Sequence, residues 1–154
     1  HLGFSPAVYG AIVSMNGALI VFCELPITRL TRKFSARRVM AVGYSLCAAG
    51  FALNGLAHTI RGLVLCMMVF TIGEMITMPT AVAYLADLAP PERRGRYMGM
   101  SGLTWATALI VGPAGGMKLF AVAPTVYWIV SAAIGVFAAW VISRPLRNSA
   151  SAQI

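Results

Sequence analysis

The chain has 154 residues, of which 59% are hydrophobic and only 10% are charged. Soluble domains carry roughly 25% charged residues, so this composition leaves too few charges to cover a water-facing surface. The formal net charge of +8 does not indicate a nucleic-acid partner, because the basic residues lie in short gaps between apolar runs, where they meet lipid headgroups. Composition therefore places the chain in a lipid bilayer.

Five apolar segments follow one another, and each has the length that an α-helix needs to cross a hydrocarbon core of roughly 30 Å. They cover residues 8–27, 39–56, 62–85, 97–117 and 125–142. None shows the period-two alternation of a membrane-spanning β-strand. The sequence predicts an all-α integral membrane protein, with a transmembrane domain over residues 1–147 and a cytoplasmic tail over 148–154.

The basic residues also predict an orientation. Ten of the 12 Lys and Arg residues fall in the gaps 28–38 and 86–96 or after residue 142, and only Arg61 and Lys118 belong to the opposite side. Loops rich in Lys and Arg stay in the cytoplasm. We therefore expect a multi-pass protein of the plasma (inner) membrane, with its N-terminus outside and its C-terminus in the cytoplasm. An outward N-terminus before five helices suggests a missing upstream helix.

One carboxyl group interrupts the third apolar segment. Glu74 lies near its middle, where a charged side chain costs roughly 2.5–3.5 kcal/mol on insertion scales. We therefore expect Glu74 to face protein or a water-filled cavity and not lipid. Because desolvation disfavours the charged form of a carboxyl group, Glu74 is a candidate for coupling to a proton or a substrate. The alternative is a structural hydrogen bond to a neighbouring helix.

Several other residues within the spans are candidates for function. Glu24, near the inner end of segment 8–27, is a second coupling candidate, although an ion pair with the basic loop that follows is the simpler explanation. Asn16, Trp105 and Met75 are candidates for lining a cavity, against the alternatives of interhelical hydrogen bonding and core packing.

Glycine and proline mark places where helices pack closely or bend. Gly73 and Pro79 weaken the third segment near the midplane, as in helices that line transport sites, although a simple proline kink is an equal alternative. In the fourth segment Gly112 and Gly116 share one face, and Pro113 removes a backbone hydrogen bond. Both features are also typical of an ordinary packing interface.

Three stretches, in this order and spacing, resemble one family. LGFSPAVYGAIVSMNGALI is similar to the outer loop and second helix of a six-helix half in the major facilitator superfamily. RLTRKFSARRVM resembles a degenerate copy of its cytoplasmic signature G-x-L-a-D-r-x-G-r-[RK], with Arg37 and Arg38 at the basic pair and Arg32 in place of the aspartate. LADLAPPERRGRYMGM and GLTWATALIVGPAGG resemble the loop and fifth helix of a half.

In the third stretch, the residues Gly112, Pro113, Gly115 and Gly116 match a G-P-x-x-G-G-type element of drug-exporting members. The resemblance implies the last five helices of a twelve-helix carrier whose N-terminal half is missing here. It also implies an alternating-access antiporter, a multidrug-efflux type of secondary transporter, with a small organic substrate and H⁺ as partners and no cofactor. A truncated remnant or an assembly subunit that does not transport is the alternative.

The resemblance further assigns the charged loops to gating. The residues concerned are Arg29, Arg32, Arg37, Arg38, Asp87, Arg93 and Arg94. Solvated loops are the alternative, since surface ion pairs contribute under about 1 kcal/mol. An enzyme is excluded, because two histidines and four acidic residues allow neither a His-rich metal site nor a Ser/His/Asp arrangement. We therefore predict no catalytic residue and no metal ligand.

Overall fold

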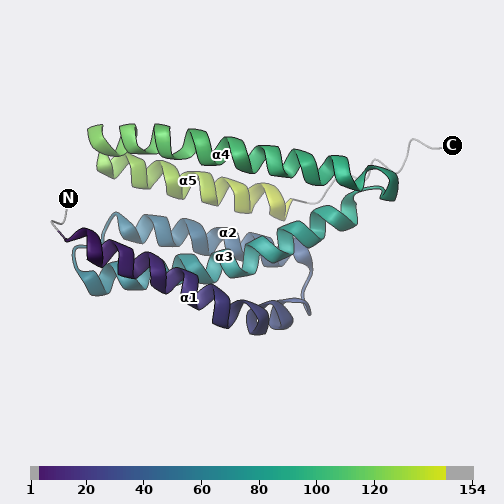
Figure 1. Ribbon diagram of the computed structural model, residues 1–154, viewed down its shortest axis with the longest axis horizontal. Coiled ribbons are helices and arrows are strands. Elements are labelled where there is room, and N and C mark those ends of the chain that lie inside the picture. Colours follow the sequence, from purple (N-terminus) through teal and green to yellow (C-terminus); the bar gives the residue numbers. More distant parts are fainter. Residues whose placement is uncertain (1–3, 145–154) are drawn as a thin grey trace.

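The computed structural model describes residues 4–144, and within that range the chain forms five α-helices and one short 3-10 helix. They are α1 Pro6–Thr31, α2 Ala36–Asn54, α3 Ile60–Leu88, η1 Pro91–Arg93, α4 Arg94–Val122 and α5 Pro124–Ser143. Successive helices run in opposite directions (Figure 1). The predicted all-α architecture is confirmed, and the tail expected over 148–154 lies outside the described residues.

Each predicted apolar segment corresponds to one α-helix, but the helices reach further than the segments. Some of the basic residues expected in loops lie in helical turns instead: Arg29 is in the last turn of α1, and Arg37 and Arg38 are in the first turn of α2. The reason is that hydropathy marks the lipid-facing length, whereas a helix continues until its backbone is capped. At the start of α3, for example, the Thr59 hydroxyl accepts a hydrogen bond from the Gly62 N–H at 3.1 Å.

Within the described residues, four helices are long and apolar enough to cross a membrane, namely α1, α3, α4 and α5. The remaining helix, α2, has 19 residues and carries two arginines in its first turn. It lies between α3 and α5 and packs against both. Its neighbours therefore shield it, which explains how a less apolar helix fits among four lipid-compatible ones.

Small residues let α2 approach both neighbours closely. A Cβ atom placed on Gly73 of α3 would lie 2.7 Å from the Gly43 carbonyl oxygen of α2, and one on Gly50 would lie 2.8 Å from Phe70 Cβ. On the other side, a Cβ on Gly135 of α5 would lie 2.8 Å from Ala48 Cβ. Because lipid gives no hydrophobic drive for helix association, such close van der Waals packing holds membrane helices together.

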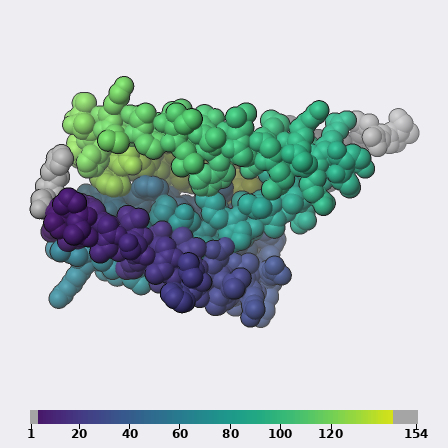
Figure 2. All heavy atoms as spheres, viewed as in Figure 1, coloured from purple at the N-terminus to yellow at the C-terminus, as the bar shows by residue number. Residues whose placement is uncertain are grey.

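In Figure 1, α1, α2 and α3 lie below α4 and α5, and α5 packs closely against α2. No residue of α4 is buried, and α1 has one buried residue, Ile12. The start of α1 and the α2–α3 and α4–α5 connections lie at one end of the bundle, and the basic α1–α2 and α3–α4 connections lie at the other. In Figure 2 the surface is hollowed between the green α4 and the purple α1.

Candidate functional site

A cluster of three polar side chains joins α1 to α3 in the middle of the bundle. The Asn16 amide nitrogen donates hydrogen bonds to the Thr71 hydroxyl at 2.9 Å and to the Glu74 Oε2 at 3.2 Å. Thr71 is fully buried, and its own hydroxyl donates to the Met67 carbonyl at 2.7 Å. Of the sequence-predicted site residues, Asn16 and Glu74 are therefore in direct contact.

This cluster gives the Glu74 carboxyl group protein partners within the membrane. Glu74 is half-buried, on the face of α3 that meets α1. Interhelical hydrogen bonds in membrane proteins contribute about 0.6 kcal/mol on average and at most about 1.7. That is less than the roughly 2.5–3.5 kcal/mol that a charge costs at mid-bilayer, so the stability of the α1–α3 contact does not by itself account for an acid here.

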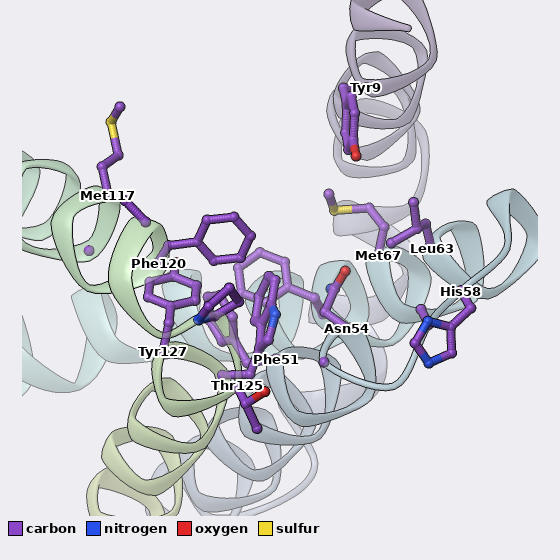
Figure 3. A pocket seen from close by; sticks show the side chains of 17 residues that line it. Tyr9, Phe51, Asn54, His58, Leu63, Met67, Met117, Phe120, Thr125 and Tyr127 are labelled. Atoms are coloured by element: carbon purple, nitrogen blue, oxygen red, sulfur yellow. The ribbon is translucent and has the colours of Figure 1, made fainter. Parts of the chain in front are cut away.

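An aromatic pocket of about 820 Å³ opens at the end of the bundle that holds the α2–α3 and α4–α5 connections. Six aromatic residues line it: Tyr9 belongs to α1, and the other five form one group of rings, namely Phe51, Phe70, Phe120, Tyr127 and Trp128. Neighbouring ring centroids lie 4.9–6.4 Å apart. In Figure 3, Phe51, Phe120 and Tyr127 gather on one side of it, and Leu63, Met67 and His58 on the other. Its size and its mainly apolar wall are those of a site for a small organic molecule.

The pocket and the polar cluster are placed along the same helix faces. Met67 and Phe70 line the pocket, and Glu74 follows them by seven and four residues on α3, so that all three share a face. Tyr9 lines the pocket, and Asn16 follows it by seven residues on α1. At a rise of 1.5 Å per residue, Glu74 lies about 6 Å further along α3 than Phe70.

In the described part of the chain, the other candidates for coupling and for lining a cavity make no hydrogen bond to the polar cluster. Glu24 is half-buried on α1, and within residues 4–144 no side chain donates a hydrogen bond to it. Trp105 on α4 is 49% exposed, whereas Met75 is buried with 3% of its surface accessible. Neither lines the aromatic pocket. A role for these three residues stays a prediction.

Among the charged residues expected to act as gates, Arg37 has a defined partner. Its Nε donates to the Ile142 carbonyl at 3.0 Å, which satisfies a free carbonyl at the end of α5 and ties α2 to it. The others are exposed: Arg29, Arg32, Arg38, Asp87, Arg93 and Arg94. Between residues 4 and 144 no ion pair joins any of them, and their gating role stays a prediction.

The glycines and prolines singled out in the sequence differ in their surroundings. Gly73 lies at a close contact between α2 and α3, and Pro79 is half-buried five residues after Glu74. On α4, Pro113 is exposed, and a Cβ on Gly112 or Gly115 would meet nothing within 4 Å. Gly116 faces Tyr127 of α5, whose Cε2 would lie 3.1 Å from an added Cβ.

Sequence reasoning did not identify Thr71 or the aromatic pocket. Thr71 precedes Glu74 by three residues, a spacing that places both side chains on one helix face and was a usable signal. The five rings come from four different helices, so only the tertiary structure brings them together. Between residues 4 and 144 no three His, Cys, Asp or Glu side chains gather as metal ligands would.

Comparison with known proteins decides the family. The sequence profile of the Major Facilitator Superfamily matches residues 1–153. The chain belongs to this superfamily. Membership supports a membrane transporter and not an enzyme, and it agrees with the bundle of long apolar helices. No solved structure matches the chain significantly.

Three relatives illustrate the match. The chain is 27% identical over 143 residues to the "Uncharacterized MFS-type transporter YdeE" of Escherichia coli K12, covering 90% of the chain and 35% of that protein. It is 28% identical to "Multidrug resistance protein MdtH" of Aeromonas hydrophila, covering 82% and 34%, and 30% identical to "Multidrug resistance protein 3" of Bacillus subtilis, covering 67% and 20%. The chain thus spans about a third or less of the length of each.

Proposed function

We propose that the chain forms part of the C-terminal half of a carrier that exports small organic molecules in exchange for protons, and that Glu74 binds the coupling proton. The observation that carries this proposal is the mid-helix hydrogen bond between α1 and α3, in which the Asn16 amide nitrogen lies 3.2 Å from Glu74 Oε2. An ionisable residue inside a membrane span commonly marks an ion or proton pathway. The names of the two multidrug resistance relatives support export as the direction.

The proposed chemistry is a competition for one carboxyl group. Ionised Glu74 attracts a cationic cargo, and protonated Glu74 does not, so that uptake of a proton releases the cargo. The aromatic pocket, about one helical turn away along α3, offers rings on which an organic molecule can stack. The basic connections lie at the end of the bundle opposite to the pocket. If these connections face the cytoplasm, as expected, the pocket lies towards the outside.

In this proposal the rest of the carrier completes the transport path. Carriers of this architecture bind cargo near the midplane, between repeated halves that rock against each other. The helix α4, in which no residue is buried, and the half-buried Glu74 would then face the half that this chain does not contain. A remnant without that half would bind cargo without moving it across the membrane.

The test compares Glu74→Gln with Glu92→Gln in the full-length carrier reconstituted in vesicles. Glu92 is exposed in η1 before α4 and serves as the matched control. We expect Glu74→Gln to abolish efflux driven by a proton gradient while expression is retained, and Glu92→Gln to leave it intact. If Glu74→Gln keeps the native dependence of transport on the gradient and on pH, Glu74 is not the coupling acid.

A further inference from the structure

We infer that Asn16 is a positioning residue for Glu74, and that it leaves one defined carboxyl oxygen, Oε1, to take the proton. This inference rests on the proposed coupling role of Glu74. It concerns which atom is protonated and what holds that atom in place. Asn16 itself neither takes the proton nor touches the cargo.

The orientation of the Asn16 amide follows from the hydrogen-bond pattern. The Thr71 hydroxyl hydrogen is used in the 2.7 Å bond to the Met67 carbonyl, so the Thr71 oxygen is left as an acceptor. The Asn16 atom that lies 2.9 Å from it must therefore be the NH₂ group and not the amide oxygen. The same nitrogen lies 3.2 Å from Glu74 Oε2, so its second hydrogen is directed at the carboxyl group.

The resulting chain of bonds has one direction. Asn16 donates to both Thr71 and Glu74, and a flipped amide would point its oxygen at two acceptors. Thr71 is fully buried, so no solvent molecule replaces it as the anchor. The Asn16 side chain is therefore held by α3 at one point and holds the Glu74 carboxyl group at another.

This arrangement distinguishes the two carboxyl oxygens. Oε2 receives the Asn16 hydrogen, whereas within residues 4–144 no donor reaches Oε1. A proton placed on Oε1 leaves Oε2 as a carbonyl oxygen, which still accepts from Asn16. The α1–α3 bond then persists in both protonation states, and Glu74 keeps its place while its charge changes.

The neighbouring charged and titratable groups do not compete for this role. On α2, the hydrogen of the Cys47 thiol is directed at the Phe70 carbonyl, 3.8 Å away. On α1, Glu24 follows Asn16 by eight residues, about 12 Å along the helix. On α4, Arg94, Arg96 and Lys118 lie near the helix ends, away from mid-span.

The test is infrared difference spectroscopy of the full-length carrier in membranes during a pH titration. The C=O stretch of protonated Glu74 is the band that Glu74→Gln removes. A hydrogen bond to the carbonyl oxygen lowers this frequency, so we expect Asn16→Leu to shift the band to higher wavenumber. Thr71→Val keeps the shape of the side chain but removes the acceptor that anchors the Asn16 amide, so it should shift the Glu74 band in the same direction. Ser14→Leu, at an exposed position on the same helix, is the control and should leave it in place.

The possible results are distinct. An unshifted Glu74 band in both Asn16→Leu and Thr71→Val overturns the positioning role and leaves the coupling role of Glu74 standing. If Thr71→Val shifts the band but Asn16→Leu does not fold, the inference still holds on the Thr71 result. If Glu74→Gln removes no carboxyl band at any pH, Glu74 never takes a proton, and both this inference and the proposed function fail.

Discussion

The close contact between α2 and α3 at Gly73 predicts that Gly73→Ala will loosen the bundle beside Glu74. A methyl group at residue 73 would lie 2.7 Å from the Gly43 carbonyl oxygen and 2.8 Å from both the amide nitrogen and the Sγ of Cys47. Two of these three atoms are backbone atoms, which cannot rotate away as the end of a side chain can. The helices α2 and α3 must therefore move apart to accept the methyl group.

The size of the effect follows from these distances. Ordinary van der Waals contact of a Cβ atom begins at 3.4 Å, whereas the added methyl group would lie 2.7 Å from the Gly43 oxygen. The two helices must therefore move apart by about 0.7 Å at this point. Overpacking of this kind typically costs about 1–3 kcal/mol. Alanine also gains up to about 1 kcal/mol over glycine in helix propensity, which partly offsets the loss.

A matched control separates the two contributions. Gly102 on α4 has nothing within 4 Å of an added Cβ, so Gly102→Ala gains propensity without a clash. We expect Gly73→Ala to be less stable than Gly102→Ala by about 1–3 kcal/mol in the free energy of unfolding, measured by steric trapping in bilayers. Equal stabilities would show that the α2–α3 contact is looser than described, and the packing argument would then be wrong.

Three further predictions concern other contacts. Thr71→Val removes an interhelical acceptor and should lower the free energy of unfolding by about 0.6–1.7 kcal/mol, whereas Thr80→Val, which breaks only a bond to its own helix at Ile76, should cost less. Arg37→Ala removes the bond to the Ile142 carbonyl and should destabilise the α2–α5 contact by about 1 kcal/mol, whereas Arg38→Ala, at an exposed site, should not; equal losses would contradict the bond. A membrane-impermeant maleimide should label His58→Cys in intact cells and Ser35→Cys only in opened cells. Labelling is measured above the background of the native Cys23, Cys47 and Cys66, and the reverse pattern would refute the orientation.

Sequence reasoning was sufficient for the membrane class and for the position of each helix along the chain. A segment must be apolar over about 20 residues to cross a bilayer, and this requirement is local, so it can be read without knowing any neighbour. The same reasoning placed Glu74 against protein, because its charge is too costly against lipid. The predicted segments were shorter than the observed helices, because hydropathy does not detect the polar turns at the helix ends, such as those that contain Arg29 and Arg37.

The tertiary structure decided which residues meet. Asn16 and Glu74 are separated by 58 positions, and nothing in the local pattern of either helix says that they are partners. Likewise, Gly43 and Gly73 define the crossing of α2 and α3, whereas the Gly112 and Gly115 positions of α4 stay open in the described part of the chain. Apolar periodicity is set by the lipid that surrounds all the helices alike, but contacts depend on the direction in which each helix faces its neighbours. That direction is a property of the assembled bundle, and so the candidate site became visible only there.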